Sequence, residues 1–231
     1  MEIAPGVYSL GQNKGFDVHA FLIDEGDAGL TLIDTLFDPA PTVIANAIRA
    51  LGRTLDDLKT IILTHAHRSH LGGLAALKRL TAATVYAHGW EADIIAGERK
   101  AQCVSWRPQD PLVTYHFPVG NNLSLSTHRP CRVDRTLAGG EQIGSLEVIH
   151  TPGHSPGHLA FYQARGRVLF TGDAVVTSPK FMAGWPGFTL NARHQAESLR
   201  RLAMVDADVV AVGHGEPILH NGGTALRSLL R

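Results

Sequence analysis

Four apolar, strand-like runs of this sequence each end in a short loop that carries histidine or aspartate. The runs span residues 60–64, 146–149, 168–172 and 209–213. The side chains that follow them are His65, His67, His70, His154, Asp173 and His214. In an open α/β sheet, rigid strands aim the loops at their ends toward one crevice. Four such ends can supply one metal centre, which requires a fold that brings them to a common edge.

The rest of the pattern indicates an α/β layered fold. Residues 7–10, 19–23 and 30–33 alternate with turn residues and predict an antiparallel meander. The spacing then predicts a helix, a strand, a helix and a strand over residues 41–51, 58–63, 74–80 and 84–87. The second half repeats this order, with strands at 146–149, 158–162, 167–170 and 208–212 and a helix over 192–204. We therefore expect one domain over residues 1–231.

Residues 97–135 break the alternation. The segment holds four prolines and scattered aromatic side chains without a sustained period. A stretch of this length without regular structure is usually a lid or a binding loop. We interpret it as a lid-like insertion, and the alternative is a surface excursion with one short helix.

Composition excludes several classes of function. The chain has 231 residues, 44% of them hydrophobic, and 21 basic side chains balance 21 acidic ones. This neutral balance does not favour nucleic-acid binding, and no 18-residue apolar stretch predicts a membrane span. Cys103 and Cys131 lack the spacing of a zinc site or disulfide framework, and the first ten residues lack a signal peptide. We expect a cytoplasmic protein with a small-molecule substrate as its partner, and leave a homodimer open.

The count of 13 histidines is high, and imidazole is the commonest metal ligand. Any one histidine is more often a packing or surface residue, and that interpretation holds for His19, His88, His116, His128, His194 and His220. The interpretation as a packing or surface residue is weaker for His65 and His67, because alternate residues of an extended segment project to the same side. The turn into Gly72 and Gly73 can bring His70 round to join them. Only the joint pattern points to a metal centre.

Four motifs in order, THAHRSH at 64–70, TPGHSPGH at 151–158, TGD at 171–173 and GHG at 213–215, resemble the metallo-β-lactamase-fold hydrolases. The resemblance is to the single-domain branch that includes lactonases and glyoxalase II-like enzymes. It implies an αβ/βα four-layer sandwich with a dinuclear site at one edge. It also implies that His65, His67 and His154 hold one metal, that His70 and His214 hold the other, and that Asp173 bridges both. Two zinc ions are expected, with iron, manganese or a mixed pair as alternatives.

The sequence departs from the family motif H-x-H-x-D-H at one position, where Ser69 replaces the aspartate. In the family this aspartate usually ligates the second metal and orients or deprotonates the attacking water. A serine hydroxyl replaces neither its charge nor its basicity. A weaker second metal, slower hydrolysis and a mononuclear site therefore all stay open, and we count Ser69 and Asp173 as the candidate catalytic residues. His158, outside the implied ligand set, is interpreted as structural.

The resemblance implies a hydrolase whose metal-bound hydroxide attacks a carboxylic ester, lactone or thioester. Candidates for an apolar substrate pocket are Trp106, Phe117, Phe181, Met182, Trp185 and Phe188. Lys180 and Asn191 are candidates for stabilising an oxyanion. One alternative is a mononuclear non-haem iron oxygenase on the same scaffold, since two histidines and a carboxylate also suit iron. The other is a non-catalytic metal-binding descendant.

Overall fold

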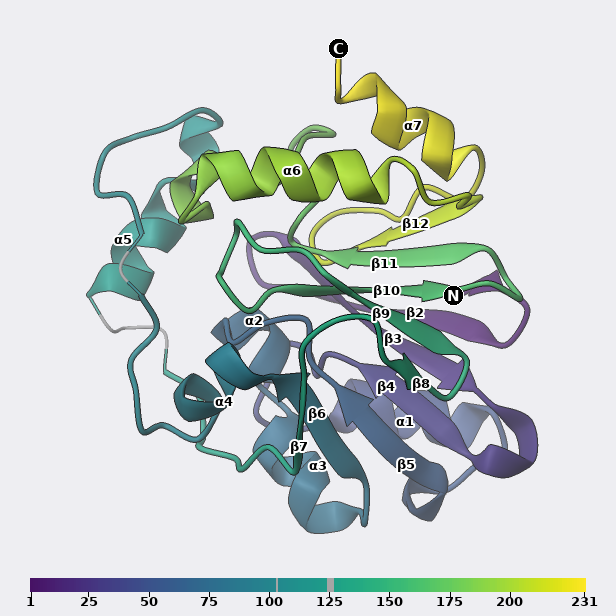
Figure 1. Ribbon diagram of the computed structural model, residues 1–231. Helices are drawn as coiled ribbons and strands as arrows, with labels where there is room; N and C mark the ends of the chain where they lie inside the picture. Colours follow the sequence, from purple (N-terminus) through teal and green to yellow (C-terminus); the bar gives the residue numbers. More distant parts are fainter. Residues whose placement is uncertain (103, 124–126) are drawn as a thin grey trace.

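The computed structural model describes residues 1–102, 104–123 and 127–231. Within them, two β-sheets pack face to face and helices cover both outer faces (Figure 1). The seven-stranded sheet has the order β1 (Glu2–Ala4), β2 (Val7–Asn13), β3 (Asp17–Asp24), β4 (Leu30–Ile33), β5 (Leu58–Ile62), β6 (Thr84–His88) and β7 (Arg135–Leu137). The five-stranded sheet has the order β12 (Val209–Val212), β11 (Val168–Gly172), β10 (Leu159–Gln163), β9 (Leu146–His150) and β8 (Gln142–Ile143).

The predicted meander is confirmed, because β1 to β4 pair antiparallel. From β4 to β7 the strands run parallel, as helical crossovers require. In the second sheet β8 to β11 pair antiparallel, and β12 lies parallel to β11. Because β11 and β12 are parallel, their carboxyl ends meet at one edge of the second sheet. His65, after β5 of the first sheet, lies 3.6 Å from Asp173 at this edge.

The helices are α1 (Thr42–Ala50), α2 (Arg68–Leu71), α3 (Leu74–Leu80), α4 (Gly89–Ile95), α5 (His116–Asn122), α6 (Ala192–Leu202) and α7 (Gly222–Ser228). Short 3-10 turns lie at Gly26–Ala28, Leu55–Asp57, Leu112–Thr114 and Pro186–Phe188. The helices α1 and α3 cover the seven-stranded sheet, and α6 and α7 cover the five-stranded one (Figure 1). The predicted helices at 41–51, 74–80 and 192–204 are confirmed, although α6 ends two residues earlier.

Alternation along the strands creates the four layers. On β3, Ala20 and Leu22 face the helices, whereas Phe21 and Ile23 face the other sheet. Phe170 on β11 is fully buried in the same inter-sheet core. Burying a side chain of this size stabilises the fold by about 1.5–3 kcal/mol. The αβ/βα four-layer sandwich is thus confirmed.

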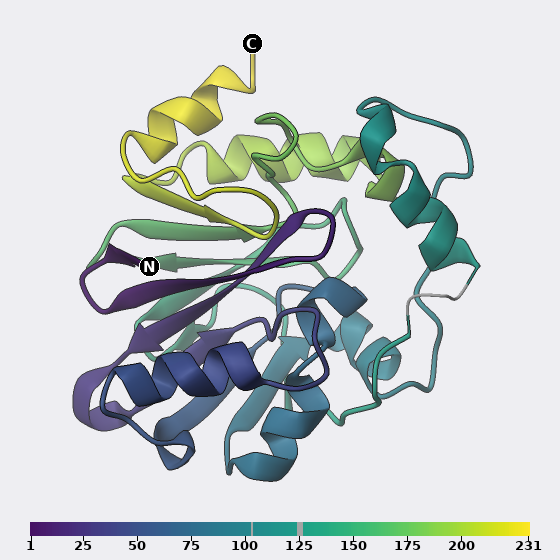
Figure 2. The same cartoon turned by 180° about the vertical axis from the view of Figure 1, so that it is seen from behind.

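The hairpin of β2 and β3 crosses the molecule, and its tip lies beside the loop that follows β12 (Figure 2). The backbone N–H of His19 donates to the carbonyl of Gly213 at 3.0 Å. This contact joins the first sheet to the second at the edge where the ligand candidates gather.

The segment 97–135 contains more regular structure than its sequence predicts. A 3-10 turn, Leu112–Thr114, and helix α5 lie within it, and β7 begins at its last residue. The Asn122 side chain closes the segment by bonding the backbone N–H and carbonyl of Val104, both at 2.8 Å. The segment therefore contains the one short helix that the alternative interpretation gives it, and its role as a lid stays a prediction.

Two sequence expectations concern the cysteines and the membrane. Cys131 is a buried thiol, and Cys103 lies outside the described residues. Across residues 1–102, 104–123 and 127–231, no helix combines the length and the apolar composition needed to cross a bilayer.

Candidate metal centre

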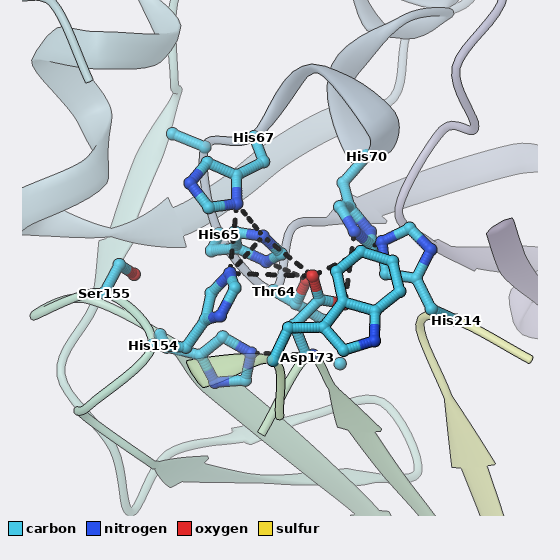
Figure 3. A network of polar contacts seen from close by, with 12 residues as sticks. Thr64, His65, His67, His70, His154, Ser155, Asp173 and His214 are labelled. Atoms are coloured by element: carbon cyan, nitrogen blue, oxygen red, sulfur yellow. Dashed lines mark hydrogen bonds and ion pairs between the residues drawn. The ribbon is translucent and has the colours of Figure 1, made fainter. Parts of the chain in front are cut away.

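Six side chains gather where the strand ends meet (Figure 3). They come from the loop after β5, the short helix α2, the loop between β9 and β10, and the first residues after β11 and β12. These are His65, His67, His70, His154, Asp173 and His214. The structure thus brings together all the side chains that the motifs single out as metal ligands.

In the first group, three ring nitrogens and one carboxylate oxygen converge. Nε2 of His65 lies 3.0 Å from Nδ1 of His67, and Nε2 of His154 lies 3.2 and 3.0 Å from those two atoms. Oδ2 of Asp173 lies 3.6 Å from His65 Nε2 and 3.5 Å from His154 Nε2. Ligand atoms of a tetrahedral zinc ion with bonds of about 2.0 Å stand roughly 3.3 Å apart. The group therefore has the dimensions of a metal site.

The protonation of these rings also fits a cation. Burial lowers the pKa of His65 and His154 well below the usual range, and it lowers the pKa of His67 to about 4. A neutral imidazole carries one N–H. Because the Thr64 hydroxyl donates its proton to Asp34 at 2.7 Å, its oxygen accepts the Nδ1–H of His65 at 3.0 Å, which leaves a lone pair on His65 Nε2. Nitrogen lone pairs that face one another repel. A cation coordinated between these nitrogens removes the repulsion and is bound by the same lone pairs.

The second group consists of His70, Asp173 and His214. Nε2 of His70 lies 3.3 Å from Asp173 Oδ1, and Nε2 of His214 lies 3.4 Å from Asp173 Oδ2. His214 donates its Nδ1–H to the carbonyl of Asp17 at 2.9 Å, so its Nε2 faces the group. Within the described part of the chain, the buried atoms His70 Nε2 and Asp173 Oδ1 have no hydrogen-bond partner. These atoms are available to a second cation.

Charge concentrates at this second group. Burial opposes the charged form of His70, but the carboxylates of Asp173 and Asp34 outweigh it and raise its pKa to about 10. Burial also opposes ionisation of Asp173, yet His214 and His70 hold its pKa well below the usual range. The His70 site thus favours a positive charge, which a bound cation supplies in place of the proton.

One oxygen of Asp173 faces both groups. Its Oδ2 lies between 3.4 and 3.6 Å from Nε2 of His65, His154 and His214. The backbone N–H of Asp173 donates to His158 Nε2 at 3.1 Å, and Nδ1 of His158 lies 2.8 Å from Thr151 Oγ1. His158 therefore holds the Asp173 backbone in place, as its structural interpretation predicts.

Comparison with known proteins agrees with this geometry. The family model described as the metallo-beta-lactamase superfamily matches residues 13–214. The chain belongs to the metallo-beta-lactamase superfamily. A metallo-beta-lactamase family protein from Thermus thermophilus has the same fold, with a TM-score of 0.72 and 27% identity over 99% of this chain and 79% of its own. A protein of this fold solved in a di-iron-bound form has a TM-score of 0.65 and 26% identity, over 92% of this chain and 94% of its own.

Relatives in the superfamily include both uncharacterized proteins and hydrolases. The uncharacterized protein YobT of Bacillus subtilis (strain 168) is 31% identical over 87% of this chain and 84% of its own. A hydroxyacylglutathione hydrolase of Cereibacter sphaeroides is 28% identical over 86% of this chain, and an N-acyl homoserine lactonase of Bacillus thuringiensis is 27% identical over 74%. The matches span only 62% and 61% of the lengths of these two hydrolases.

Ser69, the departure from the superfamily motif, lies in α2 beside His70. Its side chain is partly exposed and lines the cavity in front of the two groups. It belongs to neither group of His and Asp ligands. Its effect on the second metal stays a prediction.

Two buried carboxylates support the ligands and were not predicted. Asp34 accepts hydrogen bonds from the Thr64 backbone N–H, the Thr64 hydroxyl and His70 Nδ1 at 2.7–2.8 Å. It follows the apolar strand β4, so the strand-end pattern that singles out Asp173 could have found it. Glu91 lies in helix α4, where no comparable sequence signal exists.

A cavity of about 240 Å³ opens over the ligands, near the small end for small-molecule sites. Phe117, Trp185 and Phe188 line it as predicted, and Phe16 and Phe37 line it without having been predicted. The remaining predicted pocket residues do not line it, namely Trp106, Phe181 and Met182. Trp106 is 52% exposed.

The oxyanion candidates were wrong. Lys180 forms an exposed ion pair with Asp110 at 2.7 Å, and the Asn191 side chain caps α6 by accepting the His194 backbone N–H. Neither lines the cavity. The positions of both side chains are explained by these local partners. Of the histidines set aside from metal binding, His116 lines the cavity.

Proposed function

We propose that this protein is a metal-dependent hydrolase that cleaves a carboxylic ester, lactone or thioester of a small molecule. The observation that carries the proposal is one carboxylate oxygen, Oδ2 of Asp173, that faces two ligand groups at the floor of an apolar-walled cavity. The names of two superfamily relatives, a hydroxyacylglutathione hydrolase and an N-acyl homoserine lactonase, support this class of bond.

The residues divide into two sets of metal ligands. His65, His67, His154 and Asp173 would hold one divalent cation, and His70, His214 and Asp173 a second one. We propose zinc, although the same donor atoms also accept iron and manganese. When bound, such a cation polarises a carbonyl and lowers the pKa of a coordinated water to about 7.

The protein itself orients the ligand side chains and excludes water from the site. The Thr64 hydroxyl and the Asp17 carbonyl fix the rings of His65 and His214 so that each Nε2 faces the site. Trp185 stacks against His214, with ring centroids 4.6 Å apart, and Phe188 lies 5.3 Å from His67. These rings shield one side of the centre from water, which strengthens the electrostatic interactions inside it. The Ser69 hydroxyl stays protonated at neutral pH, so it replaces neither the charge nor the basicity of the motif aspartate. We therefore expect slow turnover.

Hydrolysis by the metal-loaded protein tests the proposal. We expect turnover on at least one member of an ester, lactone and thioester panel, and loss of at least about a hundredfold in kcat/KM for Asp173→Asn, since that change removes the shared charged ligand. His194→Gln, an exposed histidine on α6, is the matched control and should keep full activity. A single bound iron per chain, together with consumption of dioxygen, would contradict the hydrolase and favour the mononuclear iron oxygenase. Stoichiometric metal with no turnover on any of the three bond types would favour a non-catalytic protein.

A further inference from the structure

Arg68 lies in the wall of the cavity, directly between His67 and Ser69. Its side chain is partly exposed, and its guanidinium carbon lies 4.4 Å from the centre of the Phe37 ring. Within residues 1–102, 104–123 and 127–231, no carboxylate lies within ion-pair distance of this guanidinium, whereas Lys14, the other basic side chain of Lys or Arg type on the described lining, pairs with Asp38. Arg68 thus presents a positive charge to the cavity that the protein does not neutralise.

The remaining charges of the described cavity lining are accounted for. Lys14 forms an ion pair with Asp38 at 3.0 Å. The carboxylate on this lining is that of Asp173, which belongs to both ligand groups. Asp173 is thus committed to the metal centre, and on the described wall outside that centre the charged side chain without an ion-pair partner is Arg68.

The other walls are aromatic. The ring of Phe16 meets Phe117 edge-on at 5.2 Å and Trp185 edge-on at 5.4 Å. Phe117 and Trp185 are parallel, with ring centroids 6.0 Å apart and planes 4° apart. Such flat apolar surfaces bind an apolar or aromatic body, and they leave its polar end to be recognised by Arg68.

We propose that Arg68 binds an anionic group of the substrate that is separate from the bond to be cleaved. The substrates are then esters, lactones or thioesters that carry an apolar body and a carboxylate or similar oxyanion. A guanidinium suits this task because its planar fork binds such an oxyanion through two parallel hydrogen bonds. The contact of the guanidinium with the Phe37 ring restricts where that fork lies before the ligand arrives. This proposal deepens the proposed function and rests on it for the bond that is cleaved.

A binding experiment tests the charge without requiring turnover. Naphthalene-2-sulfonate and its neutral counterpart 2-naphthalenemethanol are titrated calorimetrically into the zinc-loaded protein. We expect Arg68→Gln to weaken sulfonate binding at least about tenfold and to leave the alcohol unchanged, because charge-assisted bonds are lost only for the anion. Arg68→Lys should recover part of the affinity. Arg165→Gln, which removes an exposed charge from the turn between β10 and β11, is the control and should change neither.

Kinetics separate this proposal from the proposed function. With mono-4-nitrophenyl adipate and 4-nitrophenyl hexanoate as an anionic and neutral pair, Arg68→Gln should raise KM only for the anionic ester and leave kcat near the native value. Hydrolysis of both esters without this difference overturns the role of Arg68 and leaves the hydrolase standing. Sulfonate binding that Arg68→Gln does not weaken, or equal weakening of both naphthalene probes, also overturns it. Absence of hydrolysis on the whole ester, lactone and thioester panel, together with the expected binding pattern, refutes the hydrolase alone.

Discussion

Asp34 shows how a single residue outside the ligand set determines the geometry of the second group. Its carboxylate accepts from His70 Nδ1 at 2.8 Å and thereby directs His70 Nε2 toward Asp173. The same carboxylate accepts the Thr64 hydroxyl, whose oxygen in turn receives the proton of His65. Both ligand groups therefore depend on one buried side chain.

Asp34→Asn should weaken the binding of the second metal by about tenfold to a hundredfold, since supporting partners of metal-bound histidines have effects of this size. An amide can present only one acceptor oxygen to the three donors that Asp34 serves. The measurement is a zinc titration with a competing chelator. Asp206→Asn, at an exposed ion pair with Arg167, is the control. Unchanged affinity in Asp34→Asn would show that His70 is held by other contacts.

Ser69→Asp should raise the occupancy of the second metal and the hydrolytic rate. It adds a charged oxygen ligand next to His70, at a partly exposed position on the cavity wall where the new side chain has room. Ser69→Asn, which has the same size without the charge, should do neither. Metal content and kcat measured on the three proteins decide the question. Equal values for all three would mean that Ser69 is not what limits the site.

The clustering of the six candidate ligands was predictable from sequence because each follows an apolar strand and lies in a motif with fixed spacing. The residues of the cavity wall were harder to predict, because the sequence around an aromatic residue in a loop does not indicate where its side chain points. Trp106 and Phe117 belong to the same segment, yet Trp106 is 52% exposed and Phe117 lines the cavity. Direction depends on tertiary packing, which a local pattern does not contain.

At the scale of elements, helix α4 joins the two loops that carry the first ligand group. Its Glu91 is 2% exposed and accepts the backbone N–H of Ala66, between His65 and His67, at 3.1 Å. It also accepts the Ser155 hydroxyl at 2.5 Å and the Gly157 backbone N–H at 3.1 Å, just after His154. One carboxylate thus sets the distance between two strand-end loops.

Glu91→Gln should lower the free energy of unfolding by about 1–3 kcal/mol, because one acceptor of a buried network becomes a donor. It should also weaken the first metal site, since the two loops are no longer held together. Denaturant unfolding and zinc titration measure the two effects. Glu98→Gln, at an exposed position after α4, is the matched control. A loss of stability with unchanged zinc affinity would show that Glu91 does not position the ligands.

The elements missed from the sequence are the short ones. Strands β1, β7 and β8 have two or three residues, and α2, α4 and α7 have four to seven. A helix of one or two turns shows few repeats, so its period is easily missed, although α3, with seven residues like α4 and α7, was predicted. The stability of such short helices comes mainly from packing. Longer elements with a clear period, such as α1 and β3, were predicted within a few residues.

At the scale of the whole molecule, the buried imidazoles make the metal-free fold sensitive to acid. Burial lowers the pKa of His19, His65, His67, His154 and His158, that of His67 to about 4 and that of His158 to about 3. These rings stay neutral in the folded protein, whereas in the unfolded chain they take up protons below about pH 6.5. Their stabilising contribution is complete above that pH and is lost as the pH falls toward the folded values. His70 behaves oppositely, and its contribution is lost only as the pH rises toward 10.

We therefore expect the unfolding free energy of chelator-treated protein to fall between pH 6.5 and 5, by at most about 1.4 kcal/mol per pH unit for each such histidine. Denaturant unfolding at several pH values measures this slope. His158→Gln should make it shallower, whereas the exposed His194→Gln should not. A flat profile between pH 6.5 and 5 would show that these rings are protonated in the folded state as well.

Zinc titration of metal-free protein against a competing chelator, with the metal content per chain measured alongside, tests the central claim most directly. The geometry of the two groups and the replacement of aspartate by Ser69 predict two equivalents per chain, the first held tightly and the second more weakly. Asp173→Asn should weaken both, because Asp173 faces both groups. Absence of tight binding, or two equivalents that Asp173→Asn leaves undisturbed, would contradict the account.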